Sequence, residues 1–377
     1  MRGTALKGKA KCLSLLGVLC FAAGLGSSCE PILDKEPDCR LGVALKFVYD
    51  YHMEPGGDAF AANVDCVNVF VFDKDGNYVK QSSETSEALR DGSYRMDLLL
   101  DAGDYHIVVY GGTACENATF NLTTPDWDTP YSRSGEKADI RASLPLENGE
   151  SSALLHDPEH HTGGLFYGTA NVSVSEHDWA TSLREVKVNL MKDTNNIQII
   201  LQELSSPYKI EADEYNFYII DDNFVLDGLN NPVSTAYEGY APVYRPYHQE
   251  TAEMGYVEYR DQNGALLSED EDSTVQVARA EFSTSRLFVD HIDKSRLVIT
   301  SATEKDENGE DKVIINIPLI MYLTAVRGFG DSWIKDDQEF LDRQSRWTMM
   351  FFLQKNVWVN ARVSVNWWTV RINNAKF

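Results

Sequence analysis

The chain has 377 residues, 43 % of them hydrophobic, with 34 Lys+Arg against 58 Asp+Glu. This composition is that of a globular protein and excludes disordered, collagen-like and multispan membrane chains. The formal net charge of −24 argues against a nucleic-acid partner, because phosphate binding needs a basic face.

The first 29 residues resemble an export signal. Four basic residues among the first eleven precede an apolar run over residues 12–26, which is too short to span a bilayer. Three small residues then stand directly before Cys29, as in a bacterial lipobox. We therefore interpret residues 1–28 as a lipoprotein signal peptide, rather than a short buried helix, and Cys29 as the lipidated first residue of the mature chain.

Loss of the signal peptide makes the chain more acidic. Removal of residues 1–28 leaves 30 Lys+Arg against 58 Asp+Glu, a net charge of −28. Electrostatics would not draw such a chain to an anionic membrane surface. A lipid on Cys29, with two or three acyl chains such as palmitate, is therefore the attachment that the sequence supports.

Besides Cys29, the mature chain carries Cys39, Cys66 and Cys115. Two of these three are expected to pair in an oxidising compartment, and their spacing matches no zinc site. If Cys39 and Cys66 lie at the outer ends of neighbouring strands, about a strand length separates them, which is beyond disulfide reach. We favour Cys66 with Cys115, while a bond between Cys39 and Cys115 stays open.

Apolar residues alternate over residues 43–51 and predict a half-buried strand. Tight turns then separate further short strands, as is typical of a β-sandwich. These strands are expected to form two hairpins: 64–72 with 78–81 around the turn at 73–77, and 94–100 with 105–109 around the turn at 101–104.

The segment 113–162 is polar and contains four prolines, so we interpret it as long loops between edge strands. Strand periodicity returns at 165–174, and a second all-β unit follows. Its expected strands are 186–190, 197–201, 217–220, 256–259, 287–289, 297–300 and 313–323. Short helices are expected at 83–89 and 336–344. We place the boundary near residue 178, giving an N-terminal β-sandwich domain over 29–178 and a C-terminal one over 179–377.

The most regular alternation covers residues 357–368 and predicts one long strand, or two joined at a bulge. A strand this close to the terminus can pair with another chain at an open sheet edge. An internal closing strand without such a role is an equal alternative.

Candidate metal sites are weak. His156, His160 and His161 lie close in sequence, but their spacing matches no zinc peptidase motif, and Pro158 would break a helix that aligned them. The turn at 73–77 resembles the opening of a calcium loop without its closing ligand. We interpret these segments, and the acidic runs 268–272 and 304–311, as solvated loops and turns, and expect no metal and no cofactor.

No enzyme motif is evident. The sequence lacks GxSxG, HExxH, Walker and dinucleotide glycine motifs. A glycosidase carboxylate pair cannot be singled out among 58 acidic residues. We therefore expect a non-catalytic protein.

A succession of phrases in the sequence consists of Cys29 after its signal, then residues 39–53, 58–60, 64–73, 75–76, 102–105 and 110–112. Together they resemble a known family, the FimB-type anchor lipoproteins of Bacteroidia type V fimbriae. The resemblance is strongest over residues 29–115, returns weakly at 186–201 and 365–368, and is not found over 205–350. One departure is Tyr110, where the family often has tryptophan.

The resemblance implies an all-β protein of two tandem transthyretin-like (Ig-like) β-sandwich domains, held at the surface of the outer membrane by a lipid on Cys29. Its implied partner is the fimbrial shaft subunit, and its implied role is to attach the fimbrium and limit its length, in support of cell adhesion. In this topology the second and fifth strands are antiparallel neighbours. The start of 64–72 then meets the end of 105–110, which supports pairing of Cys66 with Cys115.

A lipid-anchored glycan-binding protein is the alternative. The chain has 7 Trp and 18 Tyr, and exposed aromatic side chains could stack on sugar rings. Most of these residues fall on alternating strand positions, however, where a place in the core explains them.

Overall fold

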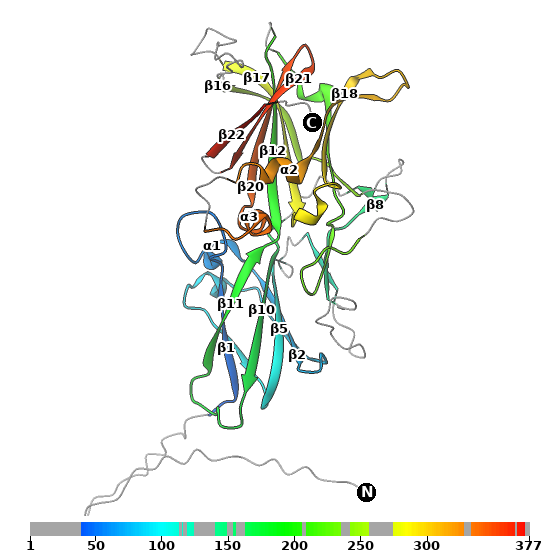
Figure 1. Cartoon of the computed structure of the whole chain (residues 1–377). Coiled ribbons are helices and arrows are strands. Elements are labelled where there is room, and N and C mark those ends of the chain that lie inside the picture. The colour runs from blue at the N-terminus through cyan, green and yellow to red at the C-terminus, as the bar shows by residue number, and fades with distance from the viewer. Residues whose placement is uncertain are drawn as a thin grey trace, which may run out of the picture.

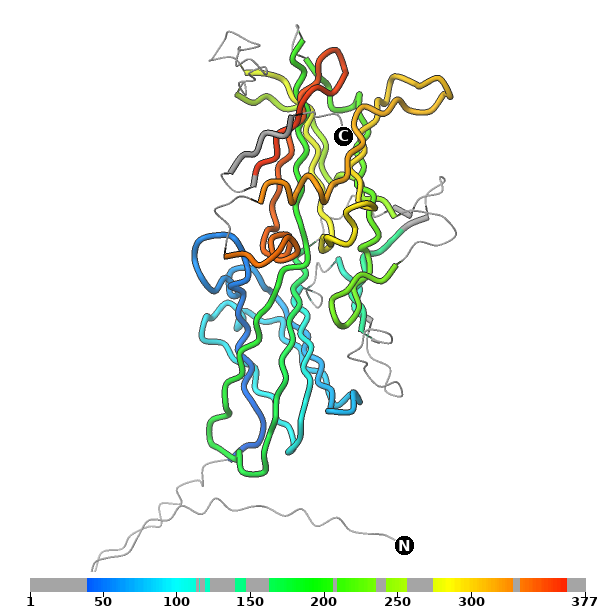
Figure 2. Tube along the Cα trace, viewed as in Figure 1, coloured from blue at the N-terminus to red at the C-terminus, as the bar shows by residue number. Residues whose placement is uncertain are grey.

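A computed structural model gives the fold as an elongated array of β-sheets, shown in Figures 1 and 2. The N-terminal strands lie at one end and the C-terminal strands at the other. The structure describes residues 39–112, 115, 119–123, 140–148, 154–155, 163–205, 209–234, 242–255, 274–327, 333–365 and 368–373.

The N-terminal part is a seven-stranded sheet in the order β3-β2-β5-β10-β11-β1-β4. Residues 184–189 of β11 pair in parallel with β1, whereas residues 190–192 pair antiparallel with β10. The sheet thus folds back on itself, and side chains from both halves, among them Leu45 and Val109, share one core. Its strands are β1 (Gly42–Val48), β2 (Val67–Asp73), β3 (Tyr78–Glu84), β4 (Met96–Leu99), β5 (Gly103–Gly111), β10 (Phe166–Val174) and β11 (Arg184–Lys192).

The C-terminal part is a second sandwich of two six-stranded sheets, in the orders β16-β17-β12-β20-β21-β22 and β19-β18-β13-β15-β9-β8. Apolar side chains of both sheets, such as Ile199 of β12 and Phe217 of β13, share its core. The first sheet contains β12 (Thr194–Glu203), β16 (His248–Gly255), β17 (Thr274–Ser285), β20 (Arg346–Gln354), β21 (Val357–Val365) and β22 (Trp368–Asn373). The second contains β8 (Glu147–Asn148), β9 (Leu154–Leu155), β13 (Tyr215–Ile220), β15 (Pro242–Tyr244), β18 (Arg296–Lys305) and β19 (Asp311–Pro318).

A small third sheet has the order β14-β7-β6, with β6 (Asn121–Thr123), β7 (Arg141–Ser143) and β14 (Val225–Asp227). Helices are short: α1 (Phe60–Asn63), α2 (Leu319–Thr324), α3 (Asp337–Arg343) and the 3-10 turns η1 (Glu87–Arg90), η2 (Ala212–Glu214) and η3 (Val289–His291). In the described part of the chain, none of them has the length and apolar character needed to cross a bilayer.

The predicted all-β sandwich class is confirmed, and several elements lie where the sequence places them. β2 and β3 form the expected hairpin, and β10 coincides with the strand expected at 165–174. Helix α3 begins where Asp336 caps it, since the carboxylate of Asp336 accepts a hydrogen bond from the backbone N–H of Glu339 at 2.9 Å.

Two strand predictions in the N-terminal sandwich are wrong. β4 and β5 form no hairpin with each other, because the turn between them crosses the folded sheet: β4 pairs with β1, and β5 pairs with β2 and β10. β1 is buried on both faces rather than half-buried, since Ala44 and Val48, on the face predicted to be polar, are themselves apolar and each only 4 % exposed.

Three predictions in the C-terminal part are also wrong. Residues 287–289 form no strand and lead into η3. The segment 313–323 is half strand and half helix, since Pro318 ends β19 and α2 follows it directly. Residues 357–368 are neither one strand nor a bulged pair, because β21 turns back into β22 as a hairpin. The strand expected at 256–259 lies outside the described residues.

The chain changes sheets at Asp193, between β11 and β12. β11, expected to open the second unit, completes the N-terminal sheet instead. The described parts of 113–162, expected as loops between edge strands, contribute β6 to β9, and β7 and β9 pair with β14 and β15 beyond Asp193. The division into domains at residues 178 and 179 stays a prediction.

Candidate functional site

The described chain begins at the end of the N-terminal sandwich that lies away from the C-terminal one (Figure 1). Arg40 is fixed there by two backbone hydrogen bonds with Ala180, at 2.8 and 3.1 Å. Its guanidinium also donates to Asp97 at 2.7 Å. Cys29, the predicted lipid site, lies outside the described residues, ten positions before Cys39.

Cys66 and Cys115, the pair that the sequence favours, are joined by a disulfide with a Cα–Cα distance of 5.5 Å. Cys66 directly precedes β2 and is fully buried. The end of β5 meets the start of β2, since Val67 pairs with Gly111 and the N–H of Gly112 donates to the carbonyl of Cys66 at 3.0 Å. The bond therefore ties the loop after β5 to the core of the N-terminal sandwich.

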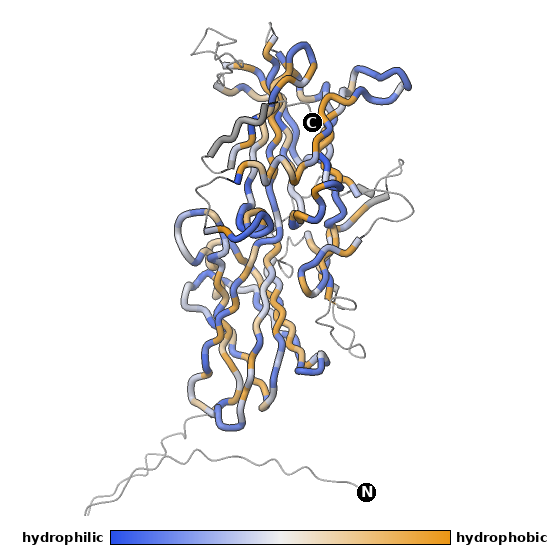
Figure 3. Tube along the Cα trace, viewed as in Figure 1, coloured by the Kyte–Doolittle hydropathy of each residue, from blue (hydrophilic) through white to orange (hydrophobic). Residues whose placement is uncertain are grey.

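The loops considered as metal sites do not form one where they are described. In the turn at 73–77, the carboxylate of Asp73 accepts hydrogen bonds from the backbone N–H groups of Asp75 and Asn77, both at 2.9 Å. In the hydrophilic β18–β19 hairpin (Figure 3), Lys305 pairs with Asp311 and Lys312 with Glu304. His156, His160, His161 and the acidic run 268–272 lie outside the described residues. Among the described residues, no group of three His, Cys, Asp or Glu side chains could hold a metal ion.

His291 and Asp221 form a histidine–carboxylate pair, with Nδ1 and Oδ1 2.5 Å apart. The two side chains are 7 % and 0 % exposed, so neither can reach a substrate in solution. We interpret the pair as a structural contact between η3 and the end of β13.

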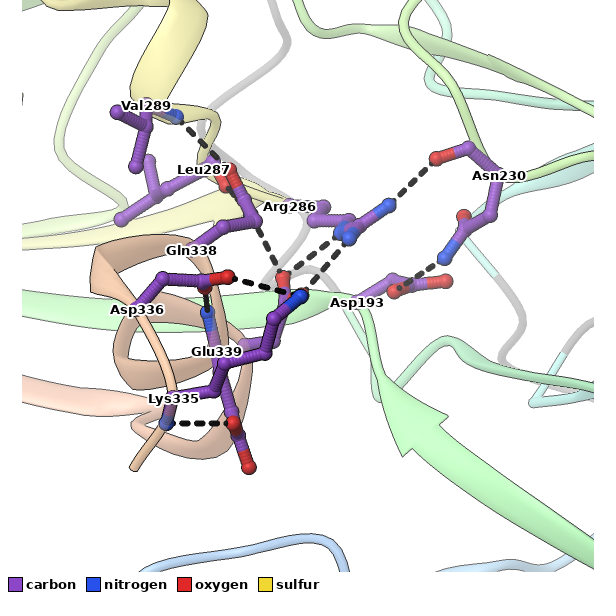
Figure 4. Close-up of polar contacts among 10 residues, drawn as sticks. Asp193, Asn230, Arg286, Leu287, Val289, Lys335, Asp336, Gln338 and Glu339 are labelled. Atoms are coloured by element: carbon purple, nitrogen blue, oxygen red, sulfur yellow. Dashed lines mark hydrogen bonds and ion pairs between the residues drawn. The ribbon is translucent and has the colours of Figure 1, made fainter. Parts of the chain in front are cut away.

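A buried polar cluster occupies the junction between the two sandwiches (Figure 4). The guanidinium of Arg286 donates to both carboxylate oxygens of Asp342 at 2.8 Å and to the carbonyl of Asn230 at 2.6 Å. The side-chain amide of Asn230 donates to Asp193 at 3.0 Å. This chain of contacts links the crossover after β11 to the loop after β14, the end of β17 and helix α3.

Asp193 is the most deeply buried charged group of this cluster, with no exposed surface. Burial raises the pKa of its carboxyl to about 7, although Arg286 and the hydrogen bond from Asn230 oppose the shift. Its second oxygen has no hydrogen-bond partner in the described structure. At neutral pH the crossover between the sandwiches therefore carries a carboxyl close to its titration midpoint.

Helix α3 supports the cluster from the C-terminal side. The side-chain amide of Gln338 donates to Asp342 and to the carbonyl of Leu287, both at 2.9 Å, and its oxygen accepts from the N–H of Val289 at 2.9 Å. Sequence reasoning missed this cluster. A polar residue, Asp193, between two strongly periodic strands was the one local indication of it.

Two tyrosines of the N-terminal sandwich also reach across the junction. Tyr110 of β5 and Tyr167 of β10 donate their hydroxyls to the carbonyls of Asp227 and Gly228, at 3.2 and 2.9 Å. Together with the polar cluster, these bonds fix the N-terminal sandwich to the segment after β14.

The C-terminal sandwich ends in an open edge. Within the described sheet, β22 is the last strand and pairs with β21. An edge strand presents backbone N–H and C=O groups to which another chain can add. Of the two alternatives left open for residues 357–368, β21 lies inside the described sheet, and β22, which pairs with it, is the outermost strand.

The chain is similar in fold to several solved structures. A candidate adhesin from Bacteroides thetaiotaomicron is 35 % identical, with 89 % of this chain and 99 % of that chain covered at a TM-score of 0.69. A candidate polysaccharide-binding protein from the same organism is 26 % identical, with the same coverage and a TM-score of 0.66. The fimbrial anchor protein Mfa2 from Porphyromonas gingivalis, at 15 % identity, shares the fold over 88 % of this chain and 99 % of its own, with a TM-score of 0.57.

A search of curated proteins finds no match. The family described as fimbrillin-A associated anchor proteins Mfa1 and Mfa2, in contrast, matches residues 35–374. This match spans both sandwiches and the junction between them, and it includes the region 205–350 in which the sequence showed no resemblance. The chain therefore belongs to the family of fimbrillin-A associated anchor proteins.

Proposed function

We propose that this chain is the lipidated subunit that attaches a fimbrium to the outer membrane and limits its length. Membership of the fimbrial anchor family, over residues 35–374, is the observation that carries the proposal. Cys29 would bear the lipid, and the fimbrial shaft subunit would be the partner.

The shape of the molecule supports this division of roles. The chain leaves toward Cys29 at one end, and the C-terminal sandwich, with the open edge of β22, lies at the other (Figure 1). Cys29 lies ten positions before Cys39, a distance that spans at most about 35 Å when the chain is extended. A lipid on Cys29 would therefore keep the N-terminal sandwich near the membrane and leave the far end for the shaft.

Length control would follow from the same geometry. A subunit fixed to the membrane by its own first residue adds once, at the base, and ends growth there. We propose no catalytic role for the chain, whose sequence contains no GxSxG, HExxH, Walker or dinucleotide glycine motif.

Crosslinking tests the proposal. Intact cells are crosslinked, the chain is enriched from the outer membrane, and its partners are identified by mass spectrometry. We expect a ladder that contains a repeating β-sandwich subunit. Recovery of glycan importers alone, or of no partner, would contradict the anchor role.

Glycan binding is a second candidate, favoured by two observations. A relative of 26 % identity is described as a candidate polysaccharide-binding protein. Trp179 and Trp333 are 42 % and 57 % exposed, and exposed indole rings stack on sugars. A shift of tryptophan fluorescence on addition of polysaccharide, lost on Trp333→Ala, would support this function, whereas an unchanged spectrum would oppose it.

A further inference from the structure

A small pocket opens at the junction, beside the crossover between the sandwiches. One wall comes from residues 49–63, after β1, and the other from residues 343–346, between α3 and β20. The N–H of Met53 donates to the carbonyl of Arg343 at 3.2 Å, which joins the two walls. Lys192, the last residue of β11, also lines the pocket. The pocket is small, with room for a small polar group.

The lining is cationic, in contrast to the acidic chain as a whole. Lys192, Arg343 and Arg346 line it, against one acidic residue, Glu54. Arg343 is already occupied, because it pairs with Glu339 at 2.7 Å and lies over the rings of Tyr51 and Trp333. The charges that could meet a ligand are therefore those of Lys192 and Arg346.

Lys192 pairs with Phe166 through its backbone, but its ammonium group forms no hydrogen bond or ion pair with the described residues. Burial lowers the pKa of its ammonium group and the neighbouring Arg346 lowers it further, while Glu54 acts in the opposite direction. A half-buried cation beside a second cation is unfavourable unless an anion joins them. An anion in the pocket would relieve both unfavourable effects.

Glu54 forms only a weak ion pair with Arg346. Its carboxylate lies 3.8 Å from Arg346, and the two side chains are 59 % and 72 % exposed, so the pair adds little stability. His52 also lines the pocket. Its Nε2 lies 2.9 Å from the carbonyl of Gly57, which can only accept a hydrogen bond, so in the neutral ring the buried Nδ1, which has no partner in the described structure, is an acceptor. A carboxylate would therefore be held by Lys192 and Arg346 and not by this ring.

We propose that this pocket binds a single carboxylate group, held between Lys192 and Arg346, which displaces the carboxylate of Glu54. Bound there, the ligand contacts both sandwiches and the crossover between them. The carboxylate comes either from a small molecule or from an acidic residue or chain end of the shaft subunit. Only the second source rests on the proposed function.

Acetate, with acetamide as its neutral counterpart, tests the pocket on the purified mature chain. Saturation transfer from the protein to the acetate methyl group, followed by NMR, gives the affinity. We expect acetate to bind and acetamide not to bind. Lys192→Met should weaken acetate binding at least tenfold, and Glu54→Gln should strengthen it severalfold, because the competing carboxylate is removed. Lys74→Gln, at an exposed lysine, is the matched control and should leave the affinity unchanged.

Two results would overturn the inference: equal acetate affinity in the wild type and Lys192→Met, or no acetate binding by either the wild type or Glu54→Gln. Glu54 is exposed, so its variant is expected to fold even if Lys192→Met does not. A separate titration with the shaft subunit distinguishes the two sources. Acetate should weaken shaft binding if the shaft supplies the carboxylate, and should leave it unchanged if a small molecule does. If the wild-type chain does not bind the shaft subunit, the proposed function is contradicted. The acetate titration would still test whether the pocket binds a carboxylate.

Discussion

The interiors of the two sandwiches differ in chemistry. Among the described residues, two buried polar side chains, Asn68 and His106, precede Asp193, whereas seventeen lie from Asp193 onward. The N-terminal sandwich is stabilised by apolar burial and one disulfide. The junction and the C-terminal sandwich add networks of buried hydrogen bonds and charges.

The two kinds of interior have different effects: apolar packing gives stability, and buried polar networks fix an arrangement. Apolar packing gives stability that depends little on pH or on a single contact, which suits the end of the molecule nearest the proposed lipid. Buried polar networks are strongly destabilising when one partner is lost, and they favour one arrangement over its alternatives. We therefore interpret the polar network at the junction as fixing the orientation of the two sandwiches relative to each other.

The largest expected effect is at Arg286. Arg286→Met removes the partner of Asp342, and the two side chains are only 14 % and 7 % exposed. An uncompensated buried carboxylate costs about 3 to 5 kcal/mol. Urea unfolding, followed by circular dichroism, should show this loss. Arg95→Met, which breaks an exposed pair with Glu185, is the control and should cost less than about 1 kcal/mol. Equal losses of unfolding free energy in the two variants would show that the buried ion pair at the junction adds no more stability than an exposed pair.

Asp193 makes the junction sensitive to pH. Its pKa of about 7 in the folded state lies above the value of about 3.9 for an unfolded aspartate. Between these values the folded chain keeps a proton that the unfolded chain has lost. The free energy of unfolding should therefore fall as the pH rises from about 4 to about 7, by as much as about 4 kcal/mol.

Asp193→Asn should remove this component and leave the hydrogen bond from Asn230 in place. Urea midpoints of the wild type and the variant, measured at several pH values from 4 to 8, provide the test. We expect the two curves to diverge as the pH rises, with the variant the more stable at pH 8. Parallel curves would mean that Asp193 does not titrate in this range.

The strands of the N-terminal sandwich could be predicted more fully than the junction. Period-two alternation and the glycine turn at 73–77 are local signals, and they located β1, β2 and β3. The partner of β4 was not predictable, because pairing with β1 depends on how the sheet folds over at β11. The contacts of Asp193, Arg286 and Asp342 bring together residues up to 149 positions apart, and no local pattern in one sequence records such contacts.

The smallest of these effects is expected from the disulfide, and only in the N-terminal sandwich. The bond between Cys66 and Cys115 closes a loop with a sequence separation of 49, and its loss should cost about 2 to 4 kcal/mol. Hydrogen exchange of a Cys66→Ala, Cys115→Ala double variant should show faster exchange in β2 and β5 and unchanged exchange in β12 and β20. Uniformly faster exchange would contradict a division of the molecule into an N-terminal support and a separately stabilised C-terminal part.

The lipid that we propose on Cys29 can be tested by cell fractionation of a Cys29→Ala strain. The amounts of this chain and of the shaft subunit are measured in the outer membrane and in the medium, with a Cys39→Ala strain as control. We expect Cys29→Ala to release both proteins into the medium, whereas Cys39→Ala should retain them in the membrane fraction. Retention of both proteins in the outer membrane of the Cys29→Ala strain would contradict the proposed lipid.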